Sequence, residues 1–136
     1  MHECELTRIV LRDTTEESFI YLREKEGQRR LFPIVIGRWE ARAIDRSVRS
    51  LSPPRPMTHD LLATIVEATG ALLERIEITD LKDGTFFASL HLKRDGETVK
   101  VDARPSDAIA LAVRTRSPIF VAEDVLREAA EVPKGP

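Results

Sequence analysis

A pattern that recurs at a fixed interval of 67 residues is the feature that most constrains the fold of this chain. Leu6–Asp13 has the form Leu-x-Arg-Ile-x-Leu-x-Asp, and Leu73–Asp80 repeats it with Ile for the second Leu. At the same interval Phe19 corresponds to Phe86, and Glu40-Ala41-x-Ala43-Ile44 corresponds to Asp107-Ala108-x-Ala110-Leu111. A fixed interval across separate segments indicates duplication. We therefore predict one domain over residues 1–136, with repeats at about 4–70 and 71–131 and a tail at 132–136.

Hydropathy periods and turn residues predict the same kinds of element in each repeat. The first should contain strands at 6–12, 19–22 and 31–36 and helices at 38–51 and 59–69. The second should contain strands at 72–80, 85–93, 98–103 and 119–121 and helices at 105–114 and 122–130. Asp13–Glu16, Asp83-Gly84 and Asp95-Gly96 read as turns, and Pro33 indicates an edge strand or a bulge. The predicted fold is α+β: a duplicated three-strand, two-helix unit forming one curved, barrel-like mixed sheet with helices packed on it.

Two predicted helices have distinct faces. In 38–51 the apolar positions are Ala41, Ile44, Val48 and Leu51, and a second face carries Arg38, Arg42, Arg46 and Arg49. This arginine stripe is either a solvated face paired locally with Glu40 and Asp45 or a surface that contacts phosphate or another subunit. In 59–69 we expect Thr58 to be the N-cap and the apolar side chains to be buried, namely Leu61, Leu62, Ile65, Val66 and Ala68.

Composition limits the classes of function. The net charge is −2, so any nucleic-acid contact must come from a local basic patch. The single cysteine, Cys4, rules out an intramolecular disulfide, and we interpret it as a buried or edge thiol rather than a nucleophile. We see no apolar signal segment at the N-terminus and no stretch of about 18 apolar residues that could span a membrane. The expected location is the cytoplasm, without membrane association.

Two polar turns, residues 55–60 and 102–107, each place an Arg-Pro pair at or near the start of a predicted helix. Helix N-termini present unpaired N–H groups that bind anions, and an adjacent Arg can clamp phosphate. We therefore predict that both turns belong to one site, with phosphate bound by Arg55, Thr58, Arg104 and Ser106. The alternative is internal ion pairing of the two arginines with Asp102, Asp60 or Asp107, with Ser106 as a first-turn hydroxyl.

The same turns hold side chains suited to acid–base or metal chemistry. The predicted catalytic residues are His59, Asp60, Asp102 and Asp107, with His59 as general acid or base. Glu40, Asp102 and Asp107 could hold Mg²⁺ or Mn²⁺, although no dedicated metal-binding spacing is present. Helix capping or dipole effects would also explain Asp60, Asp107 and Glu40, and His59 could be an ordinary surface residue.

Several stretches together resemble the bifunctional nuclease family, formerly a domain of unknown function. They are Pro33–Gly37 with Glu40-Ala41, Arg55–Leu61, Asp80–Ala88 and Asp102–Ala112. The resemblance implies the duplicated fold, a homodimer or higher homo-oligomer, and nuclease activity on RNA and DNA, the last attributed mainly to plant relatives. The expected function is thus hydrolysis of phosphodiester bonds. The alternative is a non-catalytic binding or regulatory module whose polar turns are structural ion pairs.

Overall fold

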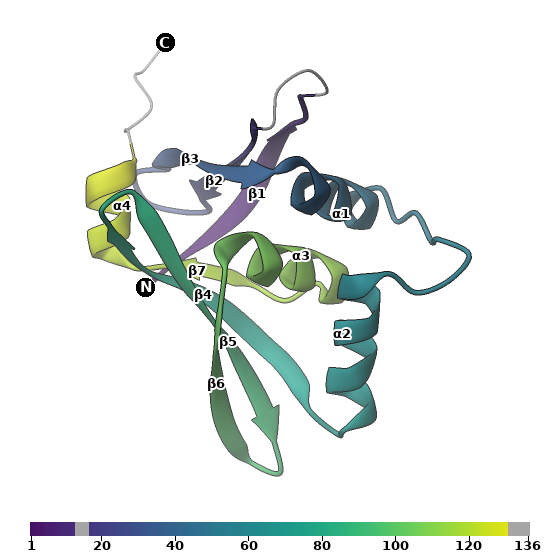
Figure 1. Cartoon of the computed structure of the whole chain (residues 1–136). Helices are drawn as coiled ribbons and strands as arrows, with labels where there is room; N and C mark the ends of the chain where they lie inside the picture. Colours follow the sequence, from purple (N-terminus) through teal and green to yellow (C-terminus); the bar gives the residue numbers. More distant parts are fainter. Residues whose placement is uncertain (13–16, 131–136) are drawn as a thin grey trace.

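The computed structural model describes residues 1–12 and 17–130. The turn predicted at Asp13–Glu16 and the tail predicted at 132–136 lie outside this part of the chain. The first half contains β1 (His2–Val10), β2 (Glu17–Glu24), β3 (Leu31–Gly37), α1 (Arg38–Val48) and α2 (Thr58–Ala68). The second half contains β4 (Leu72–Lys82), β5 (Thr85–Arg94), β6 (Glu97–Ala103), α3 (Pro105–Thr115), β7 (Ile119–Val121) and α4 (Glu123–Ala129). These elements are labelled in Figure 1.

The described strands form one seven-stranded mixed sheet in the order β3-β2-β1-β7-β4-β5-β6. Each half contributes three antiparallel strands, and β7 joins the halves by pairing antiparallel to β1 and parallel to β4. β3 and β6 are the two edges, so the sheet is open and the predicted barrel-like closure is wrong. Pro33 lies in the edge strand β3, as predicted, where its missing N–H costs the sheet least.

Two hairpin turns were predicted from Asp-Gly pairs and are confirmed. Asp83-Gly84 joins β4 to β5 with φ of 51° and 77°, and Asp95-Gly96 joins β5 to β6 with φ of 50° and 78°. Positive φ at both central residues is the requirement of the type I′ turn, whose twist matches that of the flanking strands. These two turns fix the register of the β4–β6 half of the sheet.

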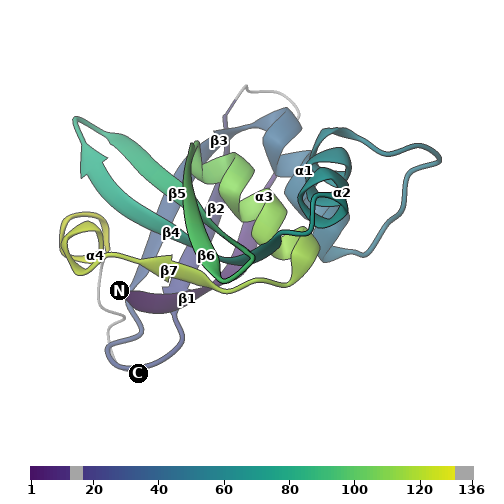
Figure 2. The same ribbon diagram turned by 90° about the horizontal axis from the view of Figure 1, so that it is seen from below.

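Helix α3 forms the centre of the core. It lies across the sheet beside α1 (Figure 2) and packs against α1, α2, β4 and β5. Its buried run, Ser106 with Ala108 to Ala112, is rich in alanine, which lets neighbouring backbones approach closely. Opposite it, Ala41 and Ile44 of α1 are buried, whereas Val48 at the end of that helix and Leu51 beyond it, which belong to the same predicted apolar face, are exposed.

Helix α2 is less buried than predicted. None of its side chains, all of which are described, is buried, and Leu61, Leu62 and Ile65 are exposed. The helix packs mainly on α3 and only lightly on β4 (Figure 1), so most of its apolar face is left uncovered by the described residues. The apolar period correctly predicted a helix there but not which side chains the fold would cover.

Both halves show three antiparallel strands followed by an eleven-residue helix, α1 or α3. They differ afterwards, because α1 is followed by α2 whereas α3 is followed by β7 and α4. Duplication of an ancestral unit therefore stays a prediction.

Candidate functional site

The two polar turns singled out in the sequence meet at the first turns of α2 and α3. His59 in α2 and Asp107 in α3 are 48 residues apart in the chain, yet His59 Nε2 lies 2.9 Å from Asp107 Oδ1. The His59 side chain is 13% exposed and that of Asp107 is 30% exposed. The contact is therefore sheltered but reachable from solvent, which is the environment that acid–base chemistry requires.

Arg104 extends this contact to a third helix. Its Nε donates to Asp107 Oδ2 at 2.9 Å and its Nη1 donates to Glu40 Oε1 at 3.2 Å, so it links the first turns of α3 and α1. Arg104 is the extended N-cap residue of α3, and Pro105 at the first helical position fixes the turn. The four side chains form a continuous chain of contacts from His59 through Asp107 and Arg104 to Glu40.

Gly37, the N-cap of α1, makes room for this arrangement. A Cβ atom added at Gly37 would collide with the Glu40 carboxylate, so any larger residue would force that side chain to turn away. The effect of a larger residue here would come from space and not from backbone conformation, since the φ of Gly37 is −72°. Glu40 can therefore fold back over the helix start and reach Arg104.

The charges at Asp107 fix its protonation state. Burial opposes ionisation of this carboxyl, but the hydrogen bonds from His59 and Arg104 outweigh it and hold the Asp107 pKa below its ordinary value. Asp107 is thus a carboxylate at neutral pH and can only accept hydrogen bonds. It follows that His59 carries a proton on Nε2 and that, in the neutral ring, Nδ1 is the basic nitrogen. No other described residue forms a hydrogen bond with the His59 ring.

Asp60, also predicted to be catalytic, has a different set of contacts. Its Oδ2 accepts from the Met57 backbone N–H at 3.0 Å and its Oδ1 accepts from Arg114 Nε at 3.1 Å. The Met57 N–H and the Arg114 guanidinium lower the Asp60 pKa although burial raises it. The N-cap is Met57 and not the predicted Thr58, which is the first helical residue, and Asp60 reaches back to it as a capping carboxylate.

The remaining predicted residues lie around this centre. Arg55 and Thr58 are exposed on the approach to α2, and Arg55 forms no ion pair with a described residue. Ser106 is buried in the first turn of α3. Asp102 lies in the edge strand β6 with its side chain exposed, and Arg104 pairs with Asp107 and Glu40 instead of with Asp102.

Two of the three predicted metal ligands already have other partners, and the third lies apart from them. Both Asp107 oxygens face donors, Glu40 faces Arg104, and Asp102 lies apart on β6. Across residues 1–12 and 17–130, no group of three or more His, Cys, Asp or Glu side chains is placed to hold a metal ion. The described side chains as arranged do not fit Mg²⁺ or Mn²⁺, so the chemistry below is derived from protein groups alone.

Comparison with known proteins identifies the family. Residues 20–134 match the family described as the bifunctional nuclease domain. The chain belongs to this family. An uncharacterized protein of Mycobacterium tuberculosis is 42% identical over 129 residues, which cover 95% of this chain and 76% of that protein.

Plant members are more distant. Bifunctional nuclease 1 of Oryza sativa subsp. japonica is 29% identical over 114 residues, covering 82% of this chain and 34% of the plant protein. Bifunctional nuclease 2 of Arabidopsis thaliana is 29% identical over 107 residues, covering 76% and 32%. The chain thus spans about a third of the length of these plant relatives. No helix in the described part of this nuclease-domain chain is long and apolar enough to cross a membrane.

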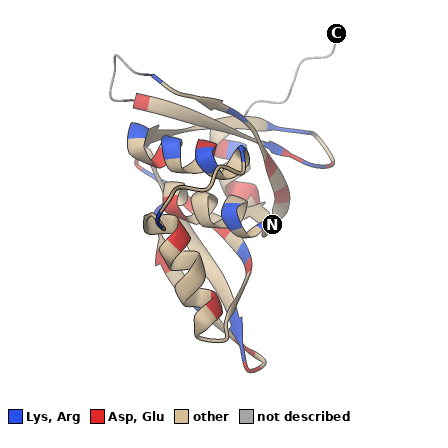
Figure 3. Cartoon of the chain, turned by 90° about the vertical axis from the view of Figure 1, so that its right-hand side faces the viewer, with Lys and Arg blue, Asp and Glu red and all other residues tan. Residues whose placement is uncertain are grey.

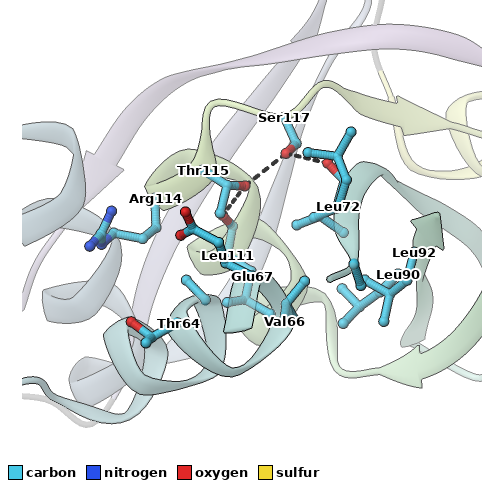
Figure 4. A pocket seen from close by; sticks show the side chains of 13 residues that line it. Thr64, Val66, Glu67, Leu72, Leu90, Leu92, Leu111, Arg114, Thr115 and Ser117 are labelled. Atoms are coloured by element: carbon cyan, nitrogen blue, oxygen red, sulfur yellow. Dashed lines mark hydrogen bonds between the residues drawn. The ribbon is translucent and has the colours of Figure 1, made fainter. Parts of the chain in front are cut away.

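Two cavities flank the site, one on each side of Arg114, which lines both. The first, of about 320 Å³, separates α2 from the sheet and is mostly apolar: Figure 4 shows Leu72, Leu90 and Leu92 facing Val66 across it. Its wall is held by Ser117, which shares a hydrogen bond with Thr115 and donates to the Leu73 carbonyl. The second, of about 400 Å³, is polar and lies under the α1–α2 loop.

Sequence reasoning missed some residues near the site. Trp39 is 70% exposed at the start of α1, with the guanidinium groups of Arg38 and Arg42 5.5 and 5.4 Å from its ring centroid. Figure 3 shows basic residues spaced along α1 on this side of the molecule. Trp39 directly precedes Glu40 and lies between two arginines of the predicted stripe, Arg38 and Arg42.

Proposed function

We propose that this domain hydrolyses phosphodiester bonds of RNA or DNA, with His59 and Asp107 as its acid–base pair. The observation that carries the proposal is the 2.9 Å contact between His59 and Asp107, formed by two turns that both lie within residues 20–134, the stretch that matches the bifunctional nuclease domain. A histidine oriented by a carboxylate is a recurrent arrangement for proton transfer near neutral pH.

The chemistry would run through His59 Nδ1. This nitrogen takes a proton from the attacking water as the new O–P bond forms. The bond from phosphorus to the leaving oxygen then breaks, and the imidazolium returns the proton to that oxygen. Asp107 holds the ring in the required tautomer and stabilises the imidazolium through Nε2–H. Arg104, whose side chain is 65% exposed, has donors left to bind a phosphate oxygen, and Arg55 and Thr58 lie on the same approach.

The exposed Trp39 supports nucleic acid as the substrate class. Bases stack on exposed aromatic rings with little regard to sequence, and neighbouring arginines contact the backbone phosphates. Trp39 with Arg38 and Arg42 offers both kinds of contact one residue from Glu40. We also propose that the domain acts in the cytoplasm as a homodimer or higher oligomer, in which the exposed apolar face of α2 would be covered.

The test is cleavage of labelled single-stranded RNA and DNA by the purified protein, with Mg²⁺, with Mn²⁺ and with chelator. His59→Gln and Asp107→Asn should lower the rate by about a hundredfold or more, the usual contribution of acid–base catalysis. Asp95→Asn, at an exposed hairpin turn, is the matched control and should leave the rate unchanged. If both site variants cleave as fast as the wild type, the assignment fails. A rate that appears only with Mg²⁺ or Mn²⁺ would place the metal with substrate oxygens.

The alternative function, a non-catalytic binding or regulatory module, is favoured by one observation. Arg104 is paired with two carboxylates, which is how a structural link between helices would look. On this alternative, Arg104→Gln would lower the thermal unfolding temperature, and the wild-type protein would bind nucleic acid without cleaving it. The cleavage assay separates the two proposals.

A further inference from the structure

A polar cavity adjoins the site on the far side of Asp60. It has a volume of about 400 Å³ and lies between the C-terminal ends of α1 and α3, under the loop that leads to α2. Its lining includes Arg46, Arg114 and Arg116 together with Ser47 and Ser50. This is room enough for one nucleotide unit.

The charges in this cavity are unbalanced. Asp60, the one carboxylate in the lining, is paired with Arg114 through its Nε. The side chains of Arg46 and Arg116 form no hydrogen bond or ion pair within the described ranges 1–12 and 17–130, although the charge of Arg46 helps to lower the Asp60 pKa. Arginines at helix C-termini can serve simply to offset the helix dipole, which places about half a negative charge at each helix C-terminus. The ends of α1 and α3 together with Asp60 therefore supply about two negative charges against three guanidinium groups, which leaves an excess of positive charge.

The backbone conformation of Arg116 also supports a role for its guanidinium in this cavity. This residue has φ of 58° and follows α3 in the left-handed conformation, where glycine is the usual choice. An arginine in this conformation carries a conformational cost. Arg114 in the last turn of α3 already places a positive charge at the helix C-terminus, so compensation of the dipole does not require a second arginine at position 116. Arg116 thus occupies a position whose backbone conformation is disfavoured for an arginine.

We propose that this cavity binds a phosphate group of a nucleic-acid strand, one step along the strand from the His59–Asp107 pair. Guanidinium groups and serine hydroxyls are the donors that phosphate oxygens need. Asp60, which lines the cavity, directly follows His59 in the first turn of α2, so the cavity and the pair adjoin the same helix end. The nucleic-acid part of this inference rests on the proposed function, but phosphate binding itself does not.

The experiment measures binding and not turnover. The dissociation constant of a labelled phosphorothioate oligonucleotide, which resists cleavage, is measured by fluorescence anisotropy at several salt concentrations. Arg46→Gln/Arg116→Gln should bind about tenfold or more weakly, with a salt dependence less steep by about 0.7 for each phosphate that the protein no longer neutralises. The matched control, Arg94→Gln/Arg127→Gln, removes the same charge from exposed residues elsewhere and should change binding less than about threefold.

A second variant guards against misfolding. Arg116→Gly removes the guanidinium while placing the preferred residue at the left-handed position, so it should fold at least as well as the wild type and still bind more weakly. Inorganic phosphate as competitor distinguishes a pocket for free phosphate from one for the strand, and competition that disappears in the Gln pair supports the site. Binding by the Gln pair and by Arg116→Gly that equals the control overturns the inference, even if the wild type proves to be a nuclease. Conversely, a wild type that binds through these arginines but never cleaves overturns the proposed function alone.

Discussion

Replacing Asp107 by Asn tests the contact on which the site depends. The change removes the charge and keeps the shape, so it isolates the electrostatic part of the bonds to His59 and Arg104. The bond to His59 is sheltered and should contribute about 1 kcal/mol to the free energy of unfolding. The bond to Arg104 involves a side chain that is 65% exposed and should add less than about 0.5 kcal/mol. We expect the variant to lose about 1 kcal/mol, a fall of about 3–4 °C in Tm for a chain of this size.

The pH dependence of that loss is the sharper part of the prediction. The Asp107 pKa lies below its ordinary value of 3.8 in the folded state, so the stabilisation is fully present above the unfolded pKa and is lost as the pH falls through the folded pKa. The Tm difference between the wild type and Asp107→Asn should be present at pH 5 and above. It should shrink below about pH 4, where the unfolded carboxyl takes up a proton.

Calorimetry or circular dichroism at pH 7, 5, 4 and 3 measures this difference directly. Asp102→Asn is the matched control, because Asp102 is exposed on β6, and it should shift Tm by less than about 1–2 °C at every pH. A Tm difference for Asp107→Asn that persists undiminished at pH 3 would show that the carboxylate charge is not what stabilises the contact, and the reasoning would be refuted.

Other contacts give independent predictions. Glu24 accepts bonds from the Arg30 backbone N–H, Nε and Nη2 in a buried pair, so Glu24→Gln should cost about 3 kcal/mol in urea unfolding with an unchanged m-value. Burial, aided by Glu24, raises the pKa of the Cys4 thiol to about 12, so iodoacetamide at pH 8 should label Cys4 rapidly only in urea; equal rates in native protein would contradict this. Asp60→Ala removes the carboxylate that reaches the Met57 N–H and should cost about 1 kcal/mol, with faster hydrogen exchange in the first turn of α2.

Local sequence signals predicted most of the elements because the backbone conformation of a turn or a helix start is set by the few residues that form it. The Asp-Gly pairs demand positive φ wherever they occur, and the Arg-Pro pair at 104–105 starts a helix through the geometry of proline itself. The helix predicted at 38–51 ends at Val48, since the three prolines that follow limit where a helix can end but do not fix its last turn. The thiol of Cys4 was predicted to be buried or at an edge, and it is buried.

What the sequence could not supply were the contacts between elements. It predicted that the two polar turns belong together. It did not predict that His59 would contact Asp107, or that Arg104 would pair with Glu40 and not with Asp102. Those choices depend on α1 and α3 packing side by side on a sheet whose order is set by the late strand β7. The exposure of the apolar face of α2 also depends on contacts between elements. The hydropathy period predicts that a helix has an apolar and a polar face, but not whether the fold covers the apolar one.

Helix α2 brings these arguments together. It carries His59 and Asp60, so it borders both the proposed acid–base pair and the proposed phosphate cavity, yet none of its described side chains is buried. A cavity of about 320 Å³ separates it from the sheet, which leaves few apolar contacts to hold it there. Two polar contacts to α3, His59 with Asp107 and Asp60 with Arg114, therefore have a large share in setting its position. Asp107 orients His59, and Asp60 orients Arg114, which lines the cavity. The bonds that place α2 on α3 are therefore the same bonds that arrange the site.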